Sequence, residues 1–341
     1  MIHLGKTQIF FAFYFLLSAL IFFSCTSSRE ETCIISPEIK VEVKFTSLED
    51  SITSFKTKQQ LVDFLGRHIE LRDIFFGRNN FPDDSIFINT LYKKFTHPSF
   101  DTLLIETKKV FGDDSELKHE FETAFANIKY YYPNFKAPRI ETVITGLESD
   151  IFVSDSLILI GLDYYLGKNA KYRPNMYEYM LTRYEKTFIV PSALLLYGID
   201  AGFNRVNMED HTVLAEMIDY GKAYYFAKRM LPCVPDSAFI GYSQREIDGA
   251  KANQDMIWKR IIKDEALFST SQKMKEHYLR ERPKTYEVGN ECPGRIAIWV
   301  GWQMVNEYVK RNPTISLPEL MQISDAQKIL KGSKYSTKVS Q

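Results

Sequence analysis

Histidine and cysteine side chains are the first candidates for chemistry, because they bind metals and act as acids, bases and nucleophiles. The six histidines include no pair at the i, i+4 spacing by which two helical histidines bind zinc. His119-Glu120 begins such a motif, but Thr123 stands where the second histidine is needed. The sequence also lacks the Gly-x-Ser-x-Gly turn of acyl hydrolases, the Gly-x-Gly-x-x-Gly turn of dinucleotide-binding proteins and the phosphate-binding P-loop. We therefore predict no metal and no cofactor, and the sequence favours a protein without catalytic activity.

Carboxylates offer a second kind of chemistry, general acid and base catalysis, when burial raises the pKa of one member of a pair. Glu216 and Asp219 lie three residues apart on one predicted helix, and Glu291 precedes the turn Cys292-Pro293-Gly294. The alternative, which the sequence favours, is that these carboxylates lie on solvated helix faces or cap a helix. Arg295 follows the same turn and could contact an anion or a peptide. The alternative, which the sequence favours, is close packing of its helix, because Gly301 in a helix interior usually marks a neighbouring backbone at short range.

The first 24 residues have the pattern of an export signal. Lys6 is their only charged side chain, and a run of fifteen residues from Ile9 to Phe23 follows, all apolar except Ser18. A membrane-spanning helix needs roughly 20 such residues, so the pattern favours a signal peptide over an uncleaved anchor. Ser24 and Cys25 end the run as in the lipobox of bacterial lipoproteins. Cys25 is therefore the predicted site of acylation by fatty acids such as palmitate.

The predicted anchor defines the domain organisation. Residues 25–38 are mostly polar and form the predicted flexible tether, and residues 39–335 form one predicted domain. Lipoprotein acylation supplies more than one acyl chain, which gives durable membrane attachment. We expect the folded body to lie in the periplasm, held by its lipid to the cell membrane or the outer membrane.

Three cysteines remain besides Cys25, so at most one disulfide can form among them. Cys233 and Cys292 are the predicted pair, because both lie in the folded body. The alternative is that both are buried and act as small hydrophobic side chains. Neither interpretation makes a metal site, because the chain has no Cys-x-x-Cys spacing.

Charge and hydrophobic periodicity limit the class of protein. The 43 lysines and arginines balance 43 acidic residues, so we expect no nucleic-acid partner.

Residues 57–132 are a predicted helical block, which Pro133 ends. Strands are predicted at 39–45, 139–145, 151–153 and 156–162, the last of them buried on both faces. Further helices are predicted at 192–199, 212–230, 294–310 and 318–330. The fold class is thus α+β, mostly helical, with a small sheet in the middle of the chain.

Several short strings occur in order along the chain. They include Phe152-Val153-Ser154-Asp155-Ser156-Leu157, Ile160-Gly161-Leu162-Asp163, Glu216-Met217-Ile218, Ile240-Gly241-Tyr242, Asn290-Glu291, Pro293-Gly294-Arg295-Ile296 and Gly301-Trp302-Gln303. Together they resemble the gliding motility-associated lipoproteins of the GldB type, found in bacteria of the Bacteroidetes group. This resemblance implies a membrane-anchored accessory protein for gliding, linked to the gliding and type IX secretion machinery, with envelope proteins as partners. It implies no biochemical activity.

A more distant resemblance is to a family of zinc peptidases. It rests on the order of a buried strand, a helix, a second helix with Glu216 and Gly221, and a Pro-Gly-Arg helix. The first helix of that family carries His-Glu-x-x-His, whereas residues 192–199 contain no metal ligand here. The resemblance implies a degenerate zincin-like scaffold that has lost its metal.

Two functions follow from these observations. The first is a non-catalytic lipoprotein that binds a partner in a groove beside the strand 156–162, with Asp163, Glu216, Glu291 and Arg295 along the groove. An exposed edge of that strand could accept an extended peptide. The second is a hydrolase that uses carboxylates such as Glu216 and Glu291 on a peptide or cell-wall substrate. The lipobox and the missing catalytic motifs favour the first.

Overall fold

The computed structural model describes residues 35, 36, 38–200 and 202–335. The predicted signal peptide 1–24, the acylation site Cys25 and most of the predicted tether lie outside the described residues. Everything described below belongs to the unit that runs from Cys33 to Gln341.

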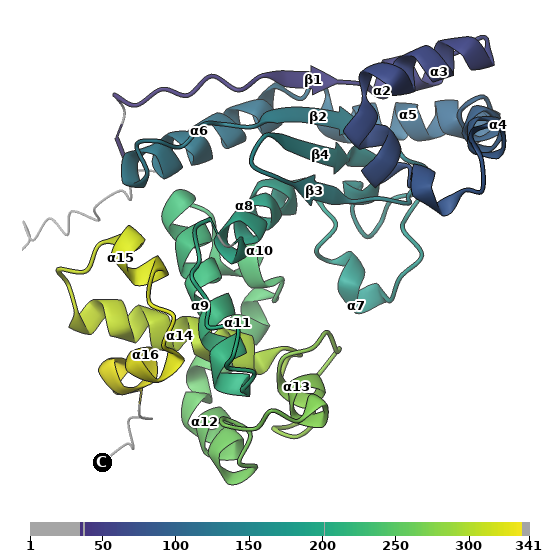
Figure 1. Cartoon of the computed structure of the whole chain (residues 1–341). Coiled ribbons are helices and arrows are strands. Elements are labelled where there is room, and N and C mark those ends of the chain that lie inside the picture. Colours follow the sequence, from purple (N-terminus) through teal and green to yellow (C-terminus); the bar gives the residue numbers. More distant parts are fainter. Residues whose placement is uncertain (1–34, 37, 201, 336–341) are drawn as a thin grey trace, which may run out of the picture. The chain divides into compact units, whose positions relative to one another are not determined.

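Four strands form a sheet in the order β1-β2-β4-β3 (Figure 1). Their bounds are β1 (Phe45–Ser47), β2 (Arg139–Val143), β3 (Ile151–Val153) and β4 (Leu157–Gly161). β1, β2 and β4 run parallel to one another, and β3 pairs antiparallel with β4. The strands predicted at 139–145, 151–153 and 156–162 are confirmed, with small shifts at their ends.

The strand predicted at 39–45 is wrong over most of its length, because β1 begins only at Phe45. The register pairs Phe45 with Ile140, and the N–H of Ile140 donates to the carbonyl of Lys44. The chain before Lys44 therefore lies beyond the start of β2. There Pro138 has no N–H with which to continue the ladder. The alternation of apolar and charged residues at 39–45 therefore did not locate the residues that pair with β2.

β4 is one of the two inner strands of the sheet, between β2 and β3. All five of its residues are buried, so the prediction of burial on both faces is confirmed. Leu157 and Leu159 pack into one hydrophobic core, and Ile158 and Ile160 pack into another, as the alternation of strand side chains requires. The predicted exposed edge is wrong, because β2 and β3 pair with both edges of β4.

The N-terminal half is a block of helices, as predicted for residues 57–132. Its elements are α2 (Glu49–Thr53), α3 (Lys58–Arg67), a π-helix (Leu71–Phe75), a 3₁₀ turn (Arg78–Asn80), α4 (Asp84–Phe95), α5 (Pro98–Phe111) and α6 (Ser115–Tyr131). Thr57 and Gln60 form the capping box that starts α3. Side chains of α2 to α5 pack against the sheet face that carries Leu157 and Leu159. α6 instead contributes to the second core, with Ile158 and Ile160.

The C-terminal half is also helical. Its elements are two 3₁₀ turns (Leu162–Tyr165 and Lys186–Phe188), α7 (Glu178–Leu181), α8 (Ile189–Ile199), α9 (Val213–Met230), α10 (Asp236–Ile240), α11 (Gln244–Ala252), α12 (Gln254–Lys263), α13 (Gln272–Tyr278), α14 (Ile296–Arg311), α15 (Leu317–Met321) and α16 (Ala326–Ser333). The helices predicted at 192–199, 212–230 and 294–310 are confirmed as α8, α9 and α14. Within the described ranges, no helix is long and apolar enough to cross a membrane.

The helix predicted at 318–330 is in fact two helices, α15 and α16. The side chain of Asp325 accepts hydrogen bonds from the N–H groups of Gln327 and Lys328, so a new helix starts there. α10 to α13 were not predicted from the sequence. The capping box of Ser243 and Glu246 at the start of α11 was a readable signal for one of them.

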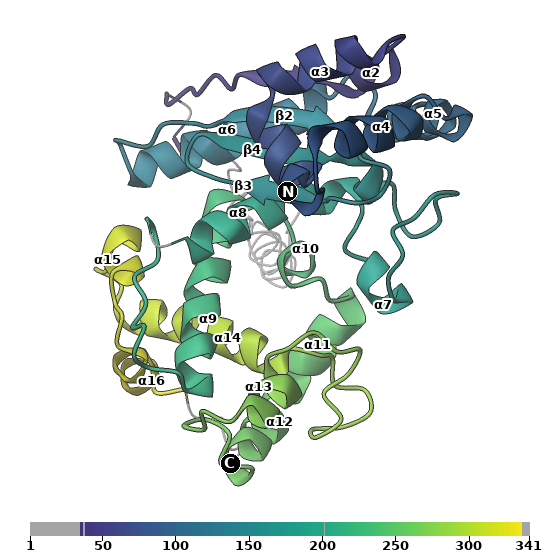
Figure 2. The ribbon, with the colours of Figure 1, turned by 45° about the vertical axis from the view of Figure 1, so that its right-hand side comes forward.

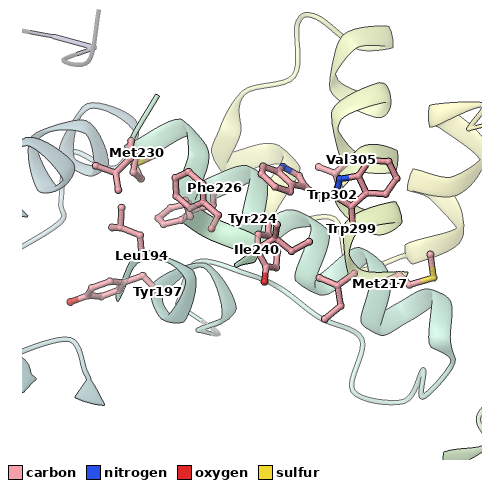
Figure 3. Packing of buried hydrophobic residues seen from close by; sticks show 14 of the residues in the cluster. Leu194, Tyr197, Met217, Tyr224, Phe226, Met230, Ile240, Trp299, Trp302 and Val305 are labelled. Atoms are coloured by element: carbon pink, nitrogen blue, oxygen red, sulfur yellow. The ribbon is translucent and has the colours of Figure 1, made fainter. Parts of the chain in front are cut away.

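α9 and α14 pack at very short range. A Cβ on Gly301 of α14 would lie 1.9 Å from the carbonyl oxygen of Met217 of α9, and a Cβ on Gly221 would lie 2.5 Å from the carbonyl oxygen of Gly301. Beside this contact the rings of Tyr224 and Trp302 lie 5.3 Å apart (Figure 3). The sequence pattern at Gly301 indicated such a close approach, and this prediction is confirmed. One end of this helix pair matters for the site described below, because Arg295 is the N-cap of α14.

Candidate functional site

Three adjoining pockets form a cleft on the folded unit. The central pocket has a volume of about 380 Å³. Residues of α7 and the loop after it, the end of α10, the start of α11 and the segment between α13 and α14 line it. Figure 2 shows α7, α10 and α11, which border this pocket. Segments that are far apart in the sequence therefore build it.

The other two pockets share residues with the central one. The second pocket, of about 650 Å³, shares Ser243, Glu246 and Pro293 with it. The third pocket, of about 510 Å³, shares Lys168 and Glu185. Because these boundary residues each line two pockets, the three pockets adjoin, and we call them together the cleft.

Arg295 lies in the wall of the central pocket. It is the N-cap of α14, with φ at 58° in the left-handed region. The segment that contains Arg282 packs closely against the turn before Arg295, because a Cβ on Gly294 would lie 1.9 Å from the carbonyl oxygen of Arg282. The guanidinium of Arg295 donates to the carbonyl of Ile240. The Arg295 side chain is only 14% exposed, and a charge so shielded from water needs hydrogen-bond partners. The carbonyl of Ile240 is one of them and helps to fix the orientation of Arg295.

Arg183 and Arg295 share one carboxylate. Nη2 of Arg183 lies 2.7 Å and Nε of Arg295 lies 3.2 Å from the same Oε2 of Glu281. Gly241 makes room for Arg183, because a Cβ there would lie 2.0 Å from its Cδ. Two positive charges thus converge on one negative charge at the mouth of the central pocket.

Glu246 lies on the boundary between the central and second pockets. Its carboxylate accepts hydrogen bonds from Ser243 and from Nζ of Lys284, at 3.0 Å each. Burial raises the pKa of Glu246, but these hydrogen bonds outweigh burial and lower its pKa below the ordinary value. Glu246 is therefore ionised and is held in place. Beside it the hydroxyl of Tyr242 donates to the carbonyl of Gly294.

Asp163, a predicted groove residue, is fully buried and does not line the cleft. Its carboxylate accepts the N–H groups of Thr145, at 2.9 Å, and Leu147, at 2.6 Å. Burial raises its pKa to about 6, although these backbone hydrogen bonds lower it. Asp163 therefore fixes the loop after β2, and its carboxylate is out of reach of a ligand.

Glu216 and Glu291 lie in different surroundings. Glu216 pairs with Lys275 at 2.6 Å and with Arg280 at 2.9 Å, and it lines none of the three pockets. Glu291 lines the second pocket, is mostly exposed and lies 3.7 Å from Arg245. Of the four predicted groove residues, only Glu291 and Arg295 thus line the cleft. The structure does not bring Glu216 and Glu291 together as a catalytic pair.

The predicted disulfide between Cys233 and Cys292 is wrong. Cys292 is a free thiol in the wall of the second pocket, whereas Cys233 is disulfide-bonded. The partner of Cys233 lies outside the described residues. Burial raises the pKa of the Cys292 thiol to about 12, so it is protonated at neutral pH and is a poor nucleophile.

No group of three or more His, Cys, Asp and Glu side chains that could hold a metal occurs in the described part of the chain. Residues 192–199, which the more distant resemblance compares with a zinc-binding helix, lie in α8. The relationship to zinc peptidases and the hydrolase alternative both stay predictions.

Sequence reasoning missed Arg183, Glu281 and Glu246 as cleft residues. One signal was available, because Arg280-Glu281-Arg282 precedes Pro283 in a segment without apolar periodicity. A charged run in such a segment is a candidate surface loop. Nothing in the sequence indicated that Arg183 would lie beside it.

Fold and site together define a mostly helical α+β protein with a charged surface cleft. The family model described as gliding motility protein GldB matches residues 29–337, and the chain belongs to this family. No curated protein and no solved structure matches the chain.

Proposed function

We propose that this protein is a lipid-anchored, non-catalytic component of the bacterial cell envelope that supports gliding. It acts by binding a partner protein of the gliding and type IX secretion machinery. The observation that carries this proposal is the match to the gliding motility family over residues 29–337. The lipobox ending at Cys25 supplies the anchor.

The chemistry of the cleft supports binding rather than catalysis. Glu281 and Glu246 are occupied by ion pairs with Arg183, Arg295 and Lys284. Cys292 has a pKa far above neutral pH. A catalytic carboxylate or thiol must be free to exchange a proton with the substrate. Here ion pairs hold both carboxylates, and burial keeps the thiol protonated.

Metabolic labelling with a fatty acid, followed by membrane fractionation, tests the anchor. We expect the wild type to carry the label and to sediment with membranes. The Cys25→Ala variant should lose the label, and Cys292→Ala, the matched control at a free cysteine, should keep it. Equal labelling of wild type and Cys25→Ala would remove the lipoprotein assignment.

Colony spreading of a gliding host that lacks its own family member tests the role. We expect the wild-type gene to restore spreading and Cys25→Ala to restore it poorly, because the unanchored body is diluted away from its membrane partner. Turnover of peptides or peptidoglycan by the purified full chain would instead favour the hydrolase alternative, for which we expect no activity above buffer.

A further inference from the structure

The cleft carries an excess of positive charge in a chain whose formal charge is zero. Eight lysines and arginines but only five glutamates line its three pockets. The cationic residues are Lys109, Lys168, Arg183, Lys186, Arg245, Arg282, Lys284 and Arg295. Arg282 and Lys186 also pair with Glu287 and Glu116, which line none of the three pockets. The excess is therefore carried by the exposed Lys168 and by Arg183 and Arg295, which share the single carboxylate of Glu281. A local excess of one sign of charge attracts ligands of the opposite sign.

The contact of Glu281 with Arg183 and Arg295 shows that these two arginines can bind a carboxylate. One oxygen of Glu281 accepts from both Arg183 and Arg295. Each guanidinium has five N–H donors in a planar fork, a geometry that matches carboxylates. Glu281 lies outside any helix or strand and its side chain is 31% exposed, against 22% for Arg183. An incoming carboxylate could therefore reach the same donors from solvent.

The shape of the cleft fits an extended chain better than a compact molecule. The central pocket shares lining residues with each of the other two, which share none with one another, so a ligand that contacts all three must extend across the central one. Tyr179 lines the central pocket, and its ring stacks at 5.9 Å on Tyr177, which is 74% exposed. Met256, half exposed, lines the second pocket. Such groups can contact the apolar parts of a polypeptide between its charges.

We infer that the cleft binds an extended, acidic polypeptide segment, one of whose carboxylates replaces Glu281 between Arg183 and Arg295. This inference rests on the proposed function, because it gives the chemistry of the partner protein. Glu281 is then an internal competitor that occupies the two arginines until the partner arrives. Its removal should strengthen binding, whereas a purely structural Glu281 would weaken binding when removed.

Fluorescence anisotropy with the full chain in mild detergent tests this. The probe is a fluorescein-labelled peptide of alternating Glu and Ala, about twelve residues long, which spans roughly 40 Å when extended. We expect it to bind the wild type and to dissociate as salt is raised. Glu281→Gln should tighten binding about threefold or more, and Arg183→Gln should weaken it about tenfold. Arg67→Gln, a matched control on an exposed arginine of α3 that lines none of the three pockets, should change nothing.

A second variant keeps the test valid if Arg183→Gln does not fold. Lys168 lines the central and third pockets, is exposed and has no ion-pair partner among the described residues. Lys168→Gln should therefore leave the thermal midpoint unchanged and still weaken peptide binding about threefold.

Three outcomes would overturn the inference. They are weaker or unchanged binding by Glu281→Gln, equal binding of an alternating Gln and Ala peptide, and binding of alginate, an acidic polysaccharide, with no binding of the acidic peptide. The labelling result for Cys25 does not depend on any of them. Failure of the acidic-peptide inference can therefore be distinguished from failure of the lipoprotein proposal.

Discussion

Glu49 and Asp114 bring two carboxyl groups into the buried region beside β1. Their exposed fractions are 5% and 7%. Ser47 donates to Asp114 at 2.8 Å, whereas Oε1 of Glu49 has no hydrogen-bond partner within the described ranges. Burial raises the pKa of Glu49 to about 7, and the negative charge of Asp114 adds to this shift. The fold therefore favours the protonated form of Glu49.

We predict that Glu49→Gln stabilises the protein at pH 8 and changes little at pH 5. The folded pKa of about 7 lies above the ordinary value of 4.5, so the folded state holds the proton more tightly than the unfolded state. The free energy of unfolding in the wild type should thus fall by up to about 3 kcal/mol between pH 4.5 and 7. Gln keeps the size of the side chain and removes the charge.

Urea unfolding of the wild type and the variant at pH 5 and pH 8 measures this effect. Asp101→Asn is the matched control, because the Asp101 side chain is exposed and its charge does not contribute to the pKa shift of Glu49. It should leave the pH dependence unchanged. A wild-type slope that survives in Glu49→Gln would show that another group causes it.

At the scale of elements, the crossing of α9 and α14 depends on Gly301. We predict that Gly301→Ala lowers the free energy of unfolding by about 3 kcal/mol, because its Cβ would lie 1.9 Å from the carbonyl oxygen of Met217. Gly249→Ala in α11 is the matched control, since a Cβ there meets nothing within 4 Å. Alanine in an open helix position should raise stability by up to about 1 kcal/mol. Thermal unfolding of both variants checks the contrast, and equal effects would contradict it.

The elements that the sequence predicts well are those with a strong local pattern. α6 has a regular apolar face that ends before Pro133, and β4 is a short, continuous apolar run. β1 was misplaced because its bounds depend on where β2 begins, which the residues of β1 do not encode. α10 and α13 are too short to show a clear helical period, and such short helices depend on packing against longer ones. α12, by contrast, has an apolar face with Ile257 and Ile261 four residues apart, which was a readable signal.

At the scale of the whole molecule, the cleft was the hardest feature to predict. Arg295 and Glu291 were recognised from the Pro-Gly turn between them, a local signal. Arg183 and Glu281 come from segments far apart in the sequence, and only the packing of the helices between them brings them within 2.7 Å. Asp163 was predicted at the groove because it follows β4, but its local hydrogen bonds to the loop after β2 bury it.

The N-terminal segment is tied to the end of α9. The N–H of Ile35 donates to Oδ1 of Asn127 at 3.0 Å, and Nδ2 of Asn127 donates to the carbonyl of Met230 at 2.9 Å. Cys233 follows Met230 and is disulfide-bonded, whereas Cys292 is free. The chain has four cysteines, so the partner of Cys233 is either Cys25 or Cys33. The proposed acylation occupies Cys25, which leaves Cys33.

We therefore predict that Cys33→Ala exposes a new thiol at Cys233. Thiol labelling of the denatured, unreduced protein should modify Cys292 alone in the wild type and both Cys233 and Cys292 in the variant. The variant should also lose about 2 to 5 kcal/mol of stability, the usual effect of removing a disulfide. Cys292→Ala should show no labelled thiol and should melt like the wild type. If Cys25→Ala rather than Cys33→Ala exposes Cys233, then Cys25 holds the disulfide, and it cannot also carry the lipid.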